Sequence, residues 1–257
     1  MSNRNLYNTG MLDHRRLDNS RRDGYSRRTH YPRNCLVFVA LPLAVFHLGS
    51  AFSGSRLLAL RDLQRLLGFF GSAAWYLPPI LVVTVLFAQH AFKRHRGRVE
   101  PAVLAGMLAE SVLWATPLFA VNYLSARVLA GPRALAATAP VGGQTAFQQV
   151  LSAVGAGVYE EFVFRLLLVG LIVVASMRLL RLKKDLAVLV ALLVSAVLFS
   201  LYHFSWETSP AGQAFTWGLF IFRAVAGMCL AVTYVYRGFG IAVGAHTLWN
   251  LFCVASQ

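Results

Sequence analysis

The stretch Gly155-Ala-Gly-Val-Tyr-Glu160-Glu161-Phe-Val-Phe-Arg165-Leu-Leu-Leu-Val places two adjacent glutamates and an arginine inside a long apolar run. An ionisable side chain in a membrane span costs at least ~2.5–3.5 kcal/mol, and two side by side cost more. Such residues persist where they are paired, or where they face a polar cavity in which chemistry takes place. Two histidines, His203 and His246, follow in similarly apolar surroundings. These four residues indicate an enzyme whose chemistry takes place inside a bilayer.

The composition agrees with a membrane protein. The chain has 257 residues, of which 57% are hydrophobic and only 13% are charged, whereas a soluble domain carries about 25% charged residues. The formal net charge of +14 would also suit a nucleic-acid-binding protein. However, the positive residues lie in an N-terminal tail and in short loops between apolar runs, which is the pattern of membrane topology. We therefore expect the lipid bilayer as a partner, and no nucleic acid.

Seven apolar runs approach the length of about 20 residues that a helix needs to cross the hydrocarbon core. We expect an all-α, polytopic transmembrane helical bundle, with an amphipathic interfacial helix in the stretch 54–71, where arginines recur among leucines. The fourth run is longer than a span requires, so we expect it to tilt or to begin as an interfacial segment. The runs are 35–53, 73–92, 101–124, 147–177, 186–206, 212–236 and 238–256.

The distribution of Lys and Arg predicts an orientation. Seventeen of these residues fall in the tail and in alternate loops on one side of the predicted spans, and five fall on the other side. The positive-inside rule then places the N-terminus in the cytoplasm. The compact size and the arginine-rich tail favour a prokaryotic inner membrane. We divide the chain into a tail expected to be disordered (1–34), N-terminal membrane helices (35–146) and a catalytic membrane core (147–257).

The first candidate motif is Glu160-Glu161-x-x-x-Arg165. On a helix Glu161 and Arg165 are four residues apart and share a face. Arginine stays charged in a protein, so it can hold Glu161 ionised and oriented. Glu160 projects about 100° away from that pair. We therefore predict a structural role for Glu161 and a chemical role for Glu160, as a general base.

Two further motifs lie in separate runs. Phe199 and His203 are four residues apart near the end of the fifth run, and His246 and Asn250 are four apart in the last run. His and Asn can both donate hydrogen bonds, so the last pair could receive a developing oxyanion. Each motif alone suits packing or an interfacial position better. Their combination, with about forty residues between motifs, favours one shared site.

These three motifs together resemble the CPBP intramembrane proteases, the family of the type II CAAX prenyl endopeptidases and of bacteriocin-processing or self-immunity proteins. The resemblance covers about residues 147–254. Phe164 precedes the arginine as in many members, whereas Leu166 stands where many members have glycine. The resemblance implies that Glu160 and His203 activate a water for attack on a peptide carbonyl. It also implies that His246 and Asn250 stabilise the oxyanion, and that Arg165 organises the glutamates.

The cofactor expectation has two forms. Zinc sites usually use three protein ligands and an open position, and Glu160, His203 and His246 would be those ligands. The chain has no HExxH motif, in which two histidines share one helix face. We favour a mechanism without a metal, and keep a metalloprotease-like mechanism with zinc as the alternative.

The leading hypothesis is thus an intramembrane endopeptidase that acts on a peptide or membrane-protein substrate, prenylated or carrying a C-terminal sorting anchor. One alternative is a transpeptidase-like protein-sorting enzyme that uses the same residues. Another is a non-enzymatic membrane immunity or scaffold protein with a vestigial site, and a fourth hypothesis is an ion-coupled carrier. The intact motif residues argue against a vestigial site, and no internal repeat supports a carrier.

One more charged residue, Arg223, lies in the sixth run. It is a candidate partner for Glu110 or Glu207, or a lining residue of the substrate path. We expect a structural ion pair, because an arginine within a span needs a compensating partner.

Overall fold

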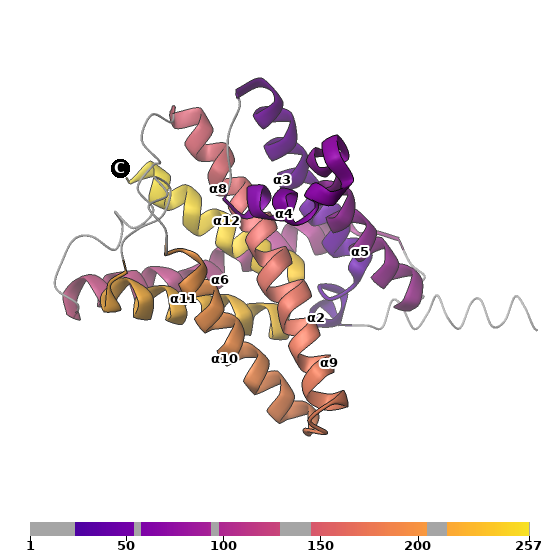
Figure 1. Ribbon diagram of the computed structural model, residues 1–257, viewed down its shortest axis with the longest axis vertical. Helices are drawn as coiled ribbons and strands as arrows, with labels where there is room; N and C mark the ends of the chain where they lie inside the picture. The colour runs from indigo at the N-terminus through magenta and orange to yellow at the C-terminus, as the bar shows by residue number, and fades with distance from the viewer. Residues whose placement is uncertain (1–23, 54–57, 94–97, 129–144, 205–214, 257) are drawn as a thin grey trace, which may run out of the picture.

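A computed structural model describes residues 24–53, 58–93, 98–128, 145–204 and 215–256, and these form an all-α bundle, as predicted (Figure 1). In chain order the elements are α2 (Tyr25–Arg28), α3 (Pro32–Ser53), α4 (Leu58–Leu66), the 3₁₀-helix η1 (Gly68–Trp75), α5 (Leu77–Lys93), α6 (Pro101–Val128), α8 (Ala146–Glu161), the π-helix η2 (Phe162–Val169), α9 (Gly170–Arg178), α10 (Lys184–Tyr202), α11 (Trp217–Arg237) and α12 (Phe239–Ala255).

Every predicted apolar run coincides with one or more of these helices. Among the described residues, four helices are long and apolar enough to cross a membrane: α3, most of α6, α10 and α11. Helices α5 and α12 are shorter and apolar. The protein is therefore an integral membrane protein, since side chains such as Leu41 and Leu48 of α3 are largely exposed and would face lipid.

The amphipathic helix expected over 54–71 is confirmed in part, as α4. Its residues Leu60 and Leu63 are buried in the main core, whereas Arg65 is exposed and lies 3.6 Å from Asp62. Residues 54–57 lie outside the described part of the chain. Beyond α4, η1 has little difference between its faces, so the amphipathic segment is shorter than predicted.

The long fourth run forms one continuous rod, α8–η2–α9, whose middle is a π-helix (Figure 1). Thr145 starts the rod with a capping box, in which its hydroxyl and the side chain of Gln148 each bond the other residue's backbone N–H. A π-helix shifts carbonyls away from their usual partners and is often found at functional sites. Here Ser195 of α10 donates a 2.9 Å hydrogen bond to the carbonyl of Phe164.

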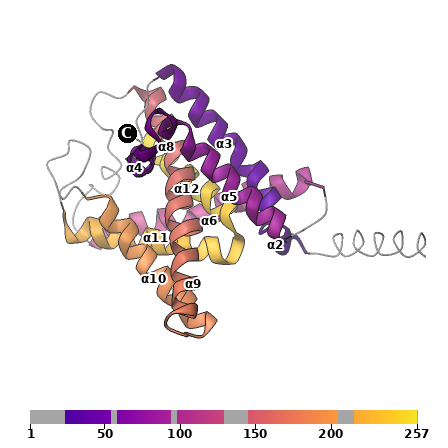
Figure 2. The same cartoon turned by 45° about the vertical axis from the view of Figure 1, so that its right-hand side comes forward.

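Helix α12 lies at the centre of the bundle and packs most extensively on α8 and α6. Small residues allow both contacts. A Cβ at Gly157 of α8 would lie 2.9 Å from the backbone nitrogen of Thr247, and Gly240 and Gly244 face Met107 and Ser111 of α6. In Figure 2 the α8–η2–α9 rod runs past α12 and ends beside α10. Glycine at position 157 thus permits the close approach of α8 and α12.

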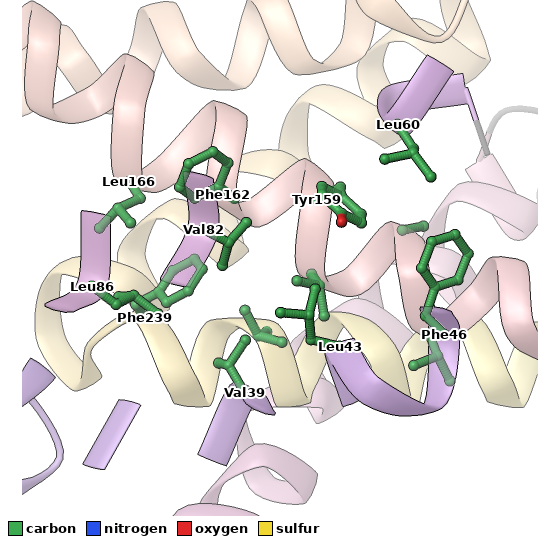
Figure 3. Packing of buried hydrophobic residues seen from close by; sticks show 14 of the residues in the cluster. Val39, Leu43, Phe46, Leu60, Val82, Leu86, Tyr159, Phe162, Leu166 and Phe239 are labelled. Atoms are coloured by element: carbon green, nitrogen blue, oxygen red, sulfur yellow. The ribbon is translucent and has the colours of Figure 1, made fainter. Parts of the chain in front are cut away.

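The main hydrophobic core lies between α3, α4, α5 and the α8–η2 rod. Figure 3 shows Phe162 of the rod beside Val82 of α5, and Tyr159 between Leu60 and Leu43. The hydroxyl of Tyr159 bonds the ring of His47 on α3. This packing buries one side of the rod. The adjacent glutamates Glu160 and Glu161 lie on the other side and face α10, α11 and α12.

Charged pairs gather where α2, the start of α6 and the end of α11 meet. Arg28 pairs with Glu100 at 2.7 Å, and Arg237 bonds both carboxylate oxygens of Glu110 and the hydroxyl of Ser26. Glu110, one of the two candidate partners for Arg223, therefore pairs with Arg237 instead. Glu207, the other expected partner, lies outside the described residues.

The predicted tail is only partly described. Residues 1–23 lie outside the described part, while Tyr25–Arg28 and the first residues of α3 are helical and Asn34 is buried. The boundaries at 34 and 146 remain predictions.

The Gly157 contact yields a stability prediction. Gly157→Ala would press a methyl group against the Thr247 backbone, and overpacking of this kind costs about 1–3 kcal/mol. Thermal unfolding in detergent should show a lower Tm. Gly170→Ala is the matched control, since a Cβ there meets nothing within 4 Å and alanine is the better helix former. An equal Tm for the two variants would contradict the close approach of α8 and α12.

Candidate active site

A buried ion pair forms the foundation of the candidate site. Glu161 and Arg165 are both fully buried, and Nε of Arg165 lies 3.2 Å from Oε2 of Glu161. Arg165 also donates a 3.0 Å hydrogen bond to the carbonyl of Gly227 on α11. The predicted pairing of Glu161 and Arg165 is therefore present, and it links the end of α8 to α11 through η2.

Phe199 packs beneath this ion pair. The guanidinium of Arg165 lies 4.3 Å from the centre of the Phe199 ring, a cation–π contact. A Cβ on Gly227 would lie only 2.9 Å from the same ring. Glycine at this position thus lets α10 and α11 approach, so that Arg165 reaches both the aromatic ring and the backbone carbonyl.

Two histidines from different helices converge on Glu160. Nε2 of His203, at the C-terminal end of α10, lies 3.5 Å from Oε2 of Glu160, and Nε2 of His246 on α12 lies 3.8 Å from the same oxygen. Glu160 and His246 are 7% and 5% exposed, and the side chain of His203 is 23% exposed. The three groups therefore enclose one small polar region in an apolar surrounding.

The other nitrogen of each histidine ring is held by a hydrogen-bond acceptor. Nδ1 of His203 lies 2.8 Å from the carbonyl of Phe199, and Nδ1 of His246 lies 2.8 Å from Oε1 of Glu161. A carbonyl and an ionised carboxylate can only accept, so each Nδ1 carries the proton. In a neutral ring Nε2 is then a lone pair, and both lone pairs point toward Glu160.

Asn250 lies one turn beyond His246 on α12, but its described contact is elsewhere. Its amide lies 3.5 Å from the carbonyl of Ala153 on α8, at the limit of a hydrogen bond. Among the described residues, no hydrogen bond joins Asn250 to Glu160 or His203. The structure thus places Asn250 beside the cluster, in a contact that also suits helix packing.

An apolar groove of about 430 Å³ has Tyr202 and Phe204 in its lining, the residues that precede and follow His203 in the chain. Tyr202 also donates a 2.6 Å hydrogen bond to Asp62 of α4. The remaining lining residues are Phe164, Leu168, Leu198 and Leu201. Apolar side chains of a ligand that reaches His203 would find a surface here.

The structure brings together six of the seven predicted residues from four helical segments, with Asn250 alongside. It adds residues that the motifs did not contain: Ser195, Gly227 and the Asp62–Tyr202 pair. A small polar or glycine residue in an apolar run was the only available signal for Ser195 and Gly227. Nothing in the spacing indicated that Asp62 would meet Tyr202, 140 residues away.

The fold and the cluster define a polytopic α-helical membrane protein with a buried group of acid, base and cationic side chains. Comparison with protein families then identifies the segment more closely. Residues 142–252 match the family described as type II CAAX prenyl endopeptidase Rce1-like. This segment contains all three motifs, so the predicted resemblance is confirmed, and the match supports a CAAX-type membrane endopeptidase. Neither the curated proteins nor the solved structures gave a match.

The different surroundings of the two glutamates yield a stability prediction. Glu161→Gln would leave the buried charge of Arg165 uncompensated, and breaking a buried pair in this way costs about 3–5 kcal/mol. Glu160→Gln should cost less, because the nearest basic atoms, the Nε2 atoms of two histidines, lie at 3.5 Å or more. Thermal unfolding of both variants in detergent tests this order. A Glu160→Gln variant that melts at or below Glu161→Gln would contradict the structural role of Glu161.

Proposed function

We propose that the protein is an intramembrane endopeptidase that hydrolyses a peptide bond within or next to the bilayer by a glutamate-dependent mechanism. The observation that supports it best is the convergence of both Nε2 atoms on one oxygen of Glu160. Separations of 3.5 and 3.8 Å are longer than direct hydrogen bonds, and are suited to a shared water.

In the proposed reaction Glu160 accepts a proton from this water while the water oxygen attacks the substrate carbonyl carbon. The C–O bond forms, the carbonyl π electrons move to oxygen, and a tetrahedral oxyanion results. Collapse of the oxyanion breaks the C–N bond, and the proton that Glu160 accepted passes through Nε2 of His203 to the leaving amine, which restores both residues. Proton transfers by positioned groups typically accelerate a reaction 10²–10⁴-fold, and the apolar surroundings strengthen each electrostatic contact.

His246 and Asn250 are the proposed oxyanion donors. Since Nδ1 of His246 already donates to Glu161, His246 can donate a second hydrogen bond only as an imidazolium, with a proton on Nε2. Asn250 can turn its amide away from Ala153 at low cost, because that bond is long. His246 can thus act as an oxyanion donor only in its protonated form.

A zinc-dependent mechanism is the alternative, and the residues fit it only in part. Two Nε2 lone pairs and a carboxylate are suitable donors, and ligating histidines commonly donate Nδ1–H to a carbonyl or carboxylate. As they stand, however, the described residues include no group of three His, Cys, Asp or Glu side chains arranged to hold a metal ion. We therefore derive no step through zinc, and the experiment below includes a chelator.

The proposed substrates are peptides or membrane proteins whose cleavage site reaches the bilayer, including prenylated C-termini and C-terminal sorting anchors. The apolar groove lined by Tyr202 and Phe204 supports this substrate class, because it offers lipophilic groups a surface at the end of α10.

Cleavage by the purified protein in reconstituted bilayers tests the proposal. The substrates are transmembrane reporter peptides with and without an isoprenoid. We expect Glu160→Gln and His203→Ala to lower kcat by at least about 100-fold, and a zinc chelator to have no effect. Loss of activity with chelator and recovery with zinc would replace the glutamate mechanism. No cleavage of any reporter by folded wild type would contradict the endopeptidase proposal.

The same assay separates hydrolysis from transpeptidation. If water is the only nucleophile that the enzyme uses, an added amine should not change the product, which keeps a free carboxylate. An amide-linked product detected by mass spectrometry would instead support the protein-sorting alternative.

We also propose a cytoplasmic N-terminus in a prokaryotic inner membrane. The contacts of Arg28 with Glu100 and of Arg237 with Ser26 support part of this proposal, because they gather three positively charged regions predicted to share one side. Cysteine labelling at Ser2 and at Arg98 in intact cells should show both positions protected from an impermeant reagent. Labelling of either position from outside would reverse the proposed orientation.

A further inference from the structure

Arg223 is a second arginine within the membrane-spanning helices, and the proposed mechanism does not use it. It lies on α11 and is 7% exposed. A charged residue inside a membrane span is costly, and such residues are usually paired or functional. Gly227, whose carbonyl holds Arg165, follows Arg223 by four residues, so both lie on the α11 face directed toward the site.

The guanidinium of Arg223 lies 5.1 Å from the centre of the Phe204 ring. Phe204 directly follows His203, and its backbone N–H bonds the carbonyl of Leu201 at the end of α10. On the other side of His203, Arg165 lies over Phe199 at 4.3 Å. Two arginine–aromatic contacts, one from η2 and one from α11, therefore bracket His203 along the chain.

We propose that Arg223 is a positioning residue for the hydrolytic reaction: through its contact with the Phe204 ring it orients the adjacent His203. The inference rests on the proposed function and adds a residue from α11 to it. Loss of this residue would slow the chemical step and leave substrate binding largely intact.

Steady-state cleavage by the full-length protein in bilayers tests the proposal, with any reporter that wild type cleaves. Removal of such supporting residues typically costs 10–100-fold in activity, so we expect Arg223→Met to lower kcat by about that factor with KM nearly unchanged. Arg223→Lys keeps the charge and should recover part of kcat. Phe204→Leu should also lower kcat, and its combination with Arg223→Met should be less than additive, because the two share one contact.

Arg237→Gln is the matched control on the same helix. Like Arg223, Arg237 contacts an aromatic ring, that of Tyr25. It pairs with Glu110 and lies at the far end of α11. This variant should lose thermal stability and keep kcat. A pair of reporters with a free or an amidated C-terminus completes the set.

Several results would overturn the positioning role. One is a wild-type kcat in both Arg223→Met and Phe204→Leu. Another is no recovery of kcat in Arg223→Lys. A third is a raised KM for the free-acid reporter alone, which would show that Arg223 binds the substrate carboxylate. If Arg223→Met does not fold, the Arg223→Lys and Phe204→Leu variants decide between these outcomes. Inactive wild type would refute the endopeptidase proposal itself, a result distinct from all of these.

Discussion

The buried ion pair of Glu161 and Arg165 is the constraint on which the rest of the site depends. Two fully buried charges are costly in an apolar interior, and the cost falls with each of their groups that finds a partner. Gly227 supplies a carbonyl to Arg165, Phe199 supplies an aromatic face, and His246 supplies an N–H to Glu161. Helices α10, α11 and α12 therefore all contact this one ion pair.

This arrangement gives the adjacent glutamates different chemistry although they are neighbours in sequence. Glu161 has its oxygens occupied by a cation and an imidazole, whereas Glu160 has only longer contacts to Nε2 atoms. Both histidine rings are oriented from behind through Nδ1, one by a backbone carbonyl and one by Glu161. The ion pair thus orients His246 through Glu161, and in this way it also determines the geometry around Glu160.

The sequence predicted the helical segments, the three motifs and the separate environments of Glu160 and Glu161, because helix periodicity and intramembrane charge are local signals. It did not predict the π-helix from Phe162 to Val169, since apolar residues there suit either helix type. It offered Glu110 or Glu207 as the partner of Arg223, whereas Glu110 pairs with Arg237. The contact of Asn250 with Ala153 also depends on how α12 packs on α8, which no spacing within α12 reveals.

Because Glu161 and Arg165 are four residues apart, they can neutralise each other before any other helix is present. During synthesis the N-terminal part of a chain is available first, and the α8–η2 segment enters the membrane ahead of α11 and α12. Neutralisation within one segment lowers the cost of inserting two charges into lipid. His203, Arg223 and His246 arrive later along the chain. The order of residues therefore makes membrane insertion of the acidic motif independent of the assembly of the site, and the candidate site is complete only after the later helices have docked.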